Sequence, residues 1–219
     1  MKEPIECKLS VDINSSGVAI VTYPDCMTTP LYDGDQCYSN MSLCYENQLD
    51  SEGNATSYWT TRDNVSIKVF KQTTIIDEYG YGYISNGKVL MKLIIPPKTR
   101  VHGIDPVNIE KYKLAEALRH IDKFRADKAY VYSQKIYVPP LTFVDDWNQL
   151  SRNDKVSRSV SIYNNDFIYK TGSLVIPNYF FPLEDSNCRK FKINGLPRFD
   201  ICEAGIHFFH NARRAEKYN

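Results

Sequence analysis

Two of the chain's four histidines, His207 and His210, flank a pair of phenylalanines near the carboxyl end. An imidazole can act as a general acid or base near neutral pH, and a thiolate beside it is a nucleophile. Cys202 precedes His207 by five residues, but side chains alternate along a strand, so these two point to opposite faces. We therefore expect a thiolate–imidazole pair to need a partner distant in the sequence, such as His102 or His120.

Basic residues also gather towards the carboxyl end, where they are interleaved with Phe191 and Phe199. The basic residues are Arg189, Lys190, Lys192, Arg198, Arg213 and Arg214. Cationic and aromatic side chains together favour contact with a phosphate group or a nucleotide. The whole chain has 27 basic and 26 acidic residues and a net charge of +1, so its overall field does not favour bulk nucleic acid. We expect these residues to bind a protein or a nucleotide.

The six cysteines are unevenly spread, with Cys7, Cys26, Cys37 and Cys44 all in the amino-terminal segment. Two disulfides or four free thiols both fit this spacing, and free thiols are the simpler interpretation. Four side chains near the carboxyl end could hold a zinc ion, but their spacing matches no known ligand pattern. They are Cys188, Cys202, His207 and His210. We expect neither a metal nor a cofactor.

Apolar residues make up 42% of the chain and charged residues 24%, as in a globular protein. Sixteen tyrosines and ten phenylalanines favour strand over helix. Near the amino end, alternating runs at residues 7–13 and 18–23 predict a hairpin across Asn14-Ser-Ser-Gly17. Residues 24–63 are polar and turn-rich, and we expect no helix there.

Alternation returns at residues 65–76, which we expect to form a strand. Asn86-Gly87 lies between two strand-like runs and predicts a tight hairpin turn. Apolar residues at intervals of three and four predict the central helix, over residues 108–121. We expect residues 129–138 to form a strand.

Further along, runs at residues 159–163 and 167–170 predict another hairpin, and residues 171–177 an edge strand. The apolar run from Ile206 to Phe209 predicts a short buried strand, which is followed by a predicted helix that ends at Lys217 or Tyr218. Asn211 lies where this helix needs its N-cap. The sequence thus predicts a β-rich α+β fold of antiparallel hairpins, with one central helix and a short C-terminal helix.

Three segments carry a resemblance to a known family. They are residues 87–102, GKVLMKLIIPPKTRVH; residues 159–172, SVSIYNNDFIYKTG; and residues 202–209, CEAGIHFF. Together they resemble an uncharacterised domain of phages and large DNA viruses, which often follows pentapeptide repeats. The resemblance covers about residues 80–219 and implies a viral source and a compact β-rich domain. It places a boundary between a Cys- and Asn-rich extension, residues 1–78, and the viral domain, residues 79–219.

A weaker resemblance concerns ADP-ribosyltransferases of the poly-ADP-ribose polymerase type. Gly205-Ile-His-Phe-Phe, followed by Ala215-Glu-Lys-Tyr218, is similar to a segment of those enzymes, and His102-Gly103 is similar to their His-Gly pair. This likeness implies a nucleotide-binding or nucleotide-modifying enzyme whose site includes His102, His207 and the basic residues named above.

The first hypothesis is a non-enzymatic viral protein, either a virion component such as a minor capsid protein or a binder of a host molecule. Its expected partners are other viral or host proteins, and its expected location is the virion or the host cytoplasm. The alternative is the nucleotide-dependent enzyme. No apolar run reaches the length of a membrane span, so we expect none. The amino end lacks the apolar core of a secretory signal, which favours the cytoplasm as the default compartment.

Overall fold

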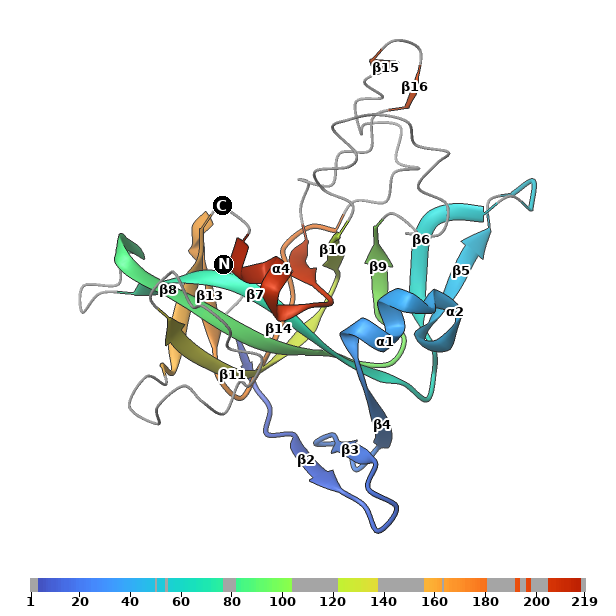
Figure 1. Ribbon diagram of the computed structural model, residues 1–219, viewed down its shortest axis with the longest axis horizontal. Coiled ribbons are helices and arrows are strands. Elements are labelled where there is room, and N and C mark those ends of the chain that lie inside the picture. Colours follow the sequence, from blue (N-terminus) through green and yellow to red (C-terminus); the bar gives the residue numbers. More distant parts are fainter. Residues whose placement is uncertain are drawn as a thin grey trace.

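The computed structural model describes residues 4–49, 51–53, 55–76, 82–103, 122–137, 156–162, 164–180, 192–193, 196–197 and 205–217. Strands far outweigh helices in these residues, and all but one of the strand pairs are antiparallel, which confirms the β-rich α+β prediction (Figure 1). The short C-terminal helix is present as α4 (Ala212–Lys217). The central helix, predicted at 108–121, lies outside the described residues.

One large sheet forms most of the described structure. Its strands follow the order β1-β14-β11-β8-β7-β17-β10-β9-β6-β5. In chain order these are β1 (Ile5–Glu6), β5 (Tyr45–Leu49), β6 (Ala55–Thr61), β7 (Ser66–Ile76), β8 (Gly82–Ile95), β9 (Arg100–His102), β10 (Lys123–Ala126), β11 (Ala129–Tyr137), β14 (Ser173–Val175) and β17 (Ile206–Phe209). β14 pairs with both β1 and β11, so the prediction of an edge strand there is wrong.

The long strand β7 organises the sheet. One of its edges pairs with β8, and the other pairs in turn with β4 (Thr28–Asp33), β17 and β12 (Arg158–Ser161). β4 continues to β3 (Ala19–Thr22) and β2 (Ser10–Ile13), and β12 continues to β13 (Asn164–Lys170). A separate two-stranded sheet joins β15 (Lys192–Ile193) to β16 (Leu196–Pro197). Because β7 and β8 lie on either side of residues 78 and 79, one sheet contains strands from both predicted segments, and the boundary stays a prediction.

Alternation along β17 divides the apolar side chains between two clusters. Ile206 and Phe208 belong to the main core, with Phe124 and the central residues of β7 and β8. Phe209 belongs to a second cluster, in which Ala215 of α4 packs on Leu90. Neighbouring residues of a strand point to opposite faces, so α4 covers the face opposite the main core. The terminal segment is thus a core strand closed by a helix.

The first predicted hairpin is confirmed. β2 and β3 pair with Ile13 opposite Ala19. The side-chain Oδ1 of Asn14 accepts hydrogen bonds from the backbone N–H groups of Ser16 and Val18, at 3.0 and 2.9 Å. Gly17 has a φ of 76°, which a residue without a Cβ adopts at little cost. The predicted hairpin at 159–170 is also confirmed, as β12 and β13.

The predicted turn at Asn86-Gly87 is wrong, because β8 runs through both residues. Thr74 of β7 pairs with Lys88, whereas the next residue, Ile75, pairs with Tyr83. Residues 84–87 of β8 therefore form an irregularity, because they lie between two pairs whose β7 members, Thr74 and Ile75, are adjacent in the chain. Asn and Gly accept the backbone conformations of a bulge as well as those of a turn, so this dipeptide alone does not distinguish the two.

Residues 24–63 contain more regular structure than the sequence predicts. Besides β4, β5 and β6, they form the short helices α1 (Gly34–Ser39) and α2 (Met41–Cys44). A disulfide joins Cys37 of α1 to Cys44 of α2, while Cys7 and Cys26 are free thiols. The simpler interpretation of four free thiols is therefore wrong for one pair. Both bonded cysteines are buried in the main core, together with Met41.

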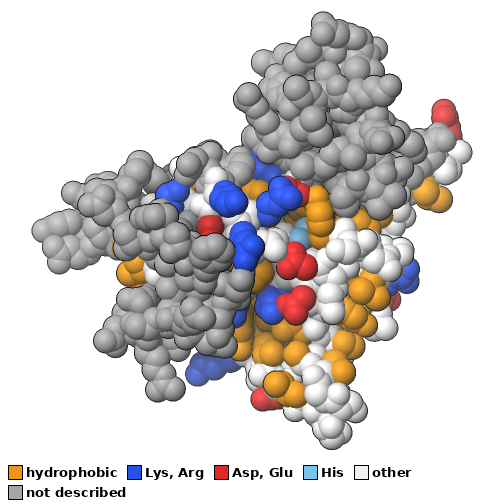
Figure 2. Space-filling view, viewed as in Figure 1, with side chains coloured by type: hydrophobic (Ala, Val, Ile, Leu, Met, Phe, Trp, Pro, Cys, Tyr) orange, Lys and Arg blue, Asp and Glu red, His pale blue; other side chains and the backbone are white. Residues whose placement is uncertain are grey.

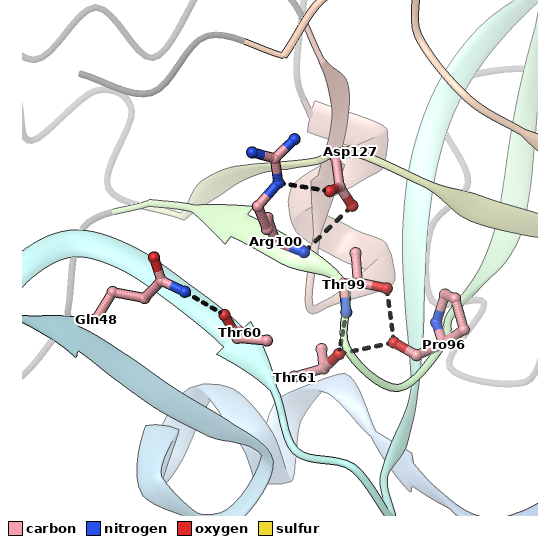
Figure 3. A network of polar contacts seen from close by, with 7 residues as sticks. All are labelled: Gln48, Thr60, Thr61, Pro96, Thr99, Arg100 and Asp127. Atoms are coloured by element: carbon pink, nitrogen blue, oxygen red, sulfur yellow. Dashed lines mark hydrogen bonds and ion pairs between the residues drawn. The ribbon is translucent and has the colours of Figure 1, made fainter. Parts of the chain in front are cut away.

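A polar network holds the turn between β8 and β9 (Figure 3). The Pro96 carbonyl accepts hydrogen bonds from the hydroxyls of Thr61, at 2.7 Å, and Thr99, at 2.6 Å. The Thr99 N–H donates to the Thr61 hydroxyl oxygen at 2.7 Å. Beside them, the Arg100 Nε donates to Asp127 at 2.8 Å. These bonds fix β9, and with it His102, between β6 and β10.

Candidate functional site

The two candidate catalytic histidines lie on either side of one arginine. β10 runs between β9 and β17, and Arg125 of β10 is paired with His102 on one side and with His207 on the other. Residues directly opposite each other in an antiparallel pair point to the same face of the sheet. The structure therefore brings His102 and His207 to one face, with Arg125 between them.

His102 is locked in the interior. The Nε of Arg125 donates a hydrogen bond to its Nδ1 at 3.2 Å, and neither side chain is exposed. Since Nδ1 accepts, the proton of the neutral ring resides on Nε2. Burial, with the Arg125 charge adding to it, lowers the pKa of His102 to about 3, so the ring is neutral at pH 7.

The packing around His102 leaves little space for a ligand. The Tyr58 ring lies 5.0 Å from the imidazole, between ring centres. A Cβ added to Gly103 would lie 2.1 Å from the Phe124 ring, so the chain at His102-Gly103 passes against a core side chain. A substrate would reach this imidazole only after the surrounding chain had moved.

His207 is half-buried, and its backbone is tied to a buried lysine. The Nζ of Lys71 donates a hydrogen bond to the His207 carbonyl at 3.1 Å. Burial, with the charge of Lys123 adding to it, lowers the pKa of Lys71 to about 7. The Lys71 ammonium also lies 5.5 Å from the centre of the Tyr169 ring. These contacts hold the backbone of β17 in place.

Most of the predicted basic group falls outside what the structure describes. Arg189, Lys190 and Arg198 are not among the described residues, and of Lys192 only the backbone is described, in β15. Cys188 and Cys202, the other two candidates for zinc binding, also lie outside. Arg213 and Arg214 are exposed on α4. In the described part of the chain, no three His, Cys, Asp or Glu side chains are placed to hold a metal.

A cavity of about 140 Å³ lies where α1 meets the junction of β17 and α4. It is lined by Asp35, Tyr38, Asp122, His210, Asn211 and Arg214. In Figure 2, acidic and basic side chains and a histidine lie close together on the face that carries these helices. The cavity therefore combines charged, aromatic and imidazole groups from three separate parts of the chain.

Two sets of polar contacts position these side chains. The Asn211 amide donates to both carboxylate oxygens of Asp35, at 3.0 and 3.1 Å. Its Oδ1 accepts from the N–H of Arg213 at 2.8 Å, so Asn211 caps α4 as predicted. On the other side, Asp122 accepts a hydrogen bond from the Tyr38 hydroxyl and pairs with Arg214. Both carboxylates thus belong to contacts that join distant segments.

His210 is the buried residue of the cavity lining. Its Nε2 lies 2.7 Å from the Tyr45 hydroxyl, and the rings of Phe124, Phe208 and Tyr38 surround it with centres 4.5, 5.3 and 5.5 Å away. Burial lowers the pKa of His210 to about 3, so this ring too is neutral at pH 7. Among the residues that the structure describes, nothing is within hydrogen-bond distance of its Nδ1.

Close backbone packing sets the position of His210. A Cβ on Gly34, the first residue of α1, would lie 2.2 Å from the His210 carbonyl oxygen. Only glycine allows α1 and the end of β17 to approach this closely. The sequence offers no local signal for this contact, because the two residues lie at opposite ends of the chain. Tyr38 and Asp122 were missed for the same reason.

No protein family, curated protein or solved structure matches this chain. Of the helices that the structure describes, none has both the length and the apolar character needed to cross a membrane.

Proposed function

We propose that this protein is a non-enzymatic interaction protein of a large DNA virus or phage, which acts either as a virion component or by binding a host protein. The observation that carries the proposal is the exposed apolar end of the β2–β3 hairpin. The resemblance of residues 80–219 to a viral domain supplies the viral source.

The hairpin end carries two apolar side chains in solvent. Ile13 is 76% exposed and Val18 is 43% exposed, on either side of the Asn14 turn. β2 pairs with β3 alone among the described strands, so its other edge has no strand partner there. In Figure 1 the hairpin projects away from the rest of the sheet. An exposed strand edge with apolar residues is a surface onto which a partner's strand or apolar patch can pack.

The placement of the candidate histidines supports a role without catalysis. His102 has no exposed surface and is bonded to Arg125. Catalytic acids and bases need access to the substrate within hydrogen-bond reach. Lys71 holds the backbone of His207, which suits a structural role for β17.

The experiment places a photo-crosslinking amino acid at position 13 and, as a matched control, at Ser39, which is exposed on α1. Expressed in cells infected with the source virus, the position-13 protein is expected to give one discrete adduct with a viral or host protein. Introducing Val18→Asp should remove that adduct, and the position-39 protein should not form it. Equal labelling from both positions would contradict the proposal.

A second measurement separates this proposal from the enzyme hypothesis. The purified protein is incubated with NAD and with labelled nucleotides, and the products are separated by chromatography. Nicotinamide release or a modified nucleotide, lost in His102→Ala, would overturn the non-enzymatic proposal. Mass spectrometry of purified virions then decides between a virion component and a binder of a host protein.

A further inference from the structure

The Nδ1 atom of His210 provides a hydrogen-bond donor for which the described residues supply no acceptor. If the Tyr45 hydroxyl donates to Nε2, the ring proton resides on Nδ1, and only that N–H lacks a partner. If instead the Nε2–H donates to the Tyr45 oxygen, the Tyr45 hydroxyl proton and the Nδ1 lone pair both lack partners among the described residues. Buried unsatisfied donors are costly, so the first arrangement is favoured. The imidazole of the cavity lining then carries an N–H that needs an acceptor.

The rest of the lining offers both an anion and a cation. In the described part of the chain, the hydrogen-bond donor on Asp35 is the neutral Asn211 amide, and no described cation forms an ion pair with this carboxylate. Asp122, by contrast, is already paired with Arg214. The Arg214 side chain is 59% exposed, and its remaining N–H groups can bind a second acceptor. One ligand can therefore place a cation at Asp35 and an acceptor at Arg214 and His210.

The size of the cavity limits the ligand. A cavity of roughly 150 Å³ accommodates benzene, so the 140 Å³ here suits about six to eight non-hydrogen atoms. A nucleotide is too large to be enclosed. The Tyr38 ring supplies an apolar wall for a short side chain. A small molecule with an ammonium and a carboxylate close together meets these conditions.

We propose that this cavity binds a small α-amino acid as a zwitterion. Asp35 binds the ammonium group, and Arg214 together with the Nδ1–H of His210 binds the carboxylate. The site is independent of the β2–β3 hairpin, so it stands whether or not the proposed function does.

The test measures binding to the full-length protein by isothermal titration calorimetry and by ligand-observed NMR, with the common small amino acids as probes. Serine, alanine, threonine and proline have a suitable size. We expect at least one of them to bind, with at least tenfold weaker binding of its deaminated and decarboxylated analogues. On binding, the Nδ1 resonance of His210 in ¹⁵N-labelled protein is expected to shift.

Two variants test the assigned contacts. Asp35→Asn and Arg214→Gln should each weaken binding at least tenfold, and Glu46→Gln, an exposed carboxylate on β5, should not. Thermal unfolding of each variant shows whether the fold is intact. Binding of cytosine or adenine, but of no amino acid, would overturn the proposal, as would no binding at millimolar concentration. Amino-acid binding that is unchanged in Asp35→Asn and Arg214→Gln would also overturn it.

Discussion

The Nε2 atom of His210 lies 2.7 Å from the hydroxyl oxygen of Tyr45, although 165 residues separate the two in the chain. Both side chains are buried. The bond connects the end of β17 to the start of β5, directly after the disulfide-bonded helix pair. It therefore couples the amino-terminal helices to the terminal strand, on either side of the cavity.

Tyr45→Phe is expected to destabilise the fold. The change removes the sole hydrogen-bond partner of Nε2 among the described residues and leaves both ring nitrogens of His210 unsatisfied. A buried polar atom without a partner costs about 1–3 kcal/mol, and the free energy of unfolding from urea titrations at pH 7 should fall by that amount. Tyr132→Phe, at an exposed position on β11, is the matched control and should change it by less than about 0.5 kcal/mol. Equal urea midpoints for Tyr45→Phe and the wild type would contradict the role of this bond.

Acid should destabilise the protein from pH 6.5 downwards. In the folded state the pKa values of His102 and His210 are about 3, whereas the ordinary value is 6.5. Between these values the unfolded chain binds more protons, so stability rises with pH and is lost on acidification. Each histidine contributes a slope of about 1.4 kcal/mol per pH unit.

The free energy of unfolding, measured in urea at intervals from pH 7 to pH 5, checks this expectation. In His210→Gln the slope should fall by the contribution of one histidine, whatever the stability of the variant at pH 7. A wild-type profile that is flat from pH 6.5 to pH 5 would show that the two rings are not held neutral.

Reduction of the Cys37–Cys44 disulfide is expected to lower stability. Because the two cysteines are seven residues apart, the closed loop is short, and the loss of chain-entropy stabilisation is about 2 kcal/mol. Thermal unfolding with and without a phosphine reductant measures it. The double variant Cys37→Ala, Cys44→Ala is the control, since its melting temperature should not respond to the reductant. A wild-type melting temperature that stays constant on reduction would exclude a stabilising role.

The sequence predicts the elements whose signals are local. The β2–β3 hairpin is confirmed because Asn14 and Gly17 satisfy the turn from within it. The predicted end of β17 and the predicted N-cap of α4 are also confirmed. There the signal is again local, because Asn211 accepts a hydrogen bond from a backbone N–H two residues away. Each of these structures depends on residues that are neighbours in the chain.

Longer-range structure escapes such patterns. Asn86-Gly87 has the sequence of a tight turn, but it lies within β8, in an irregularity between the pairs Ile75–Tyr83 and Thr74–Lys88. The cavity combines Asp35, Asp122 and His210, which come together only through packing at Gly34. Strand pairing brings His102 and His207 to either side of Arg125, and no local pattern predicts this arrangement because the three residues are far apart in the chain.

Lys71→Met is expected to be more stable than the wild type at pH 7, and its advantage should be smaller at pH 9.5. Burial lowers the pKa of Lys71 to about 7, below its ordinary value of 10.5. Between these values the unfolded state binds more protons, so the lysine lowers the stability of the wild type as the pH falls from 10.5 towards 7. Methionine has a similar length and does not titrate, so the variant lacks this dependence.

The free energy of unfolding of Lys71→Met minus that of the wild type is the quantity to compare. It should be about 3 kcal/mol larger at pH 7 than at pH 9.5. The lost bond to the His207 carbonyl shifts both values alike and cancels in the comparison. Lys128→Met, at a half-buried position between β10 and β11, serves as control and should show no such pH dependence. If Lys71→Met changes stability by the same amount at both pH values, the ammonium of Lys71 is not held in a low-dielectric interior.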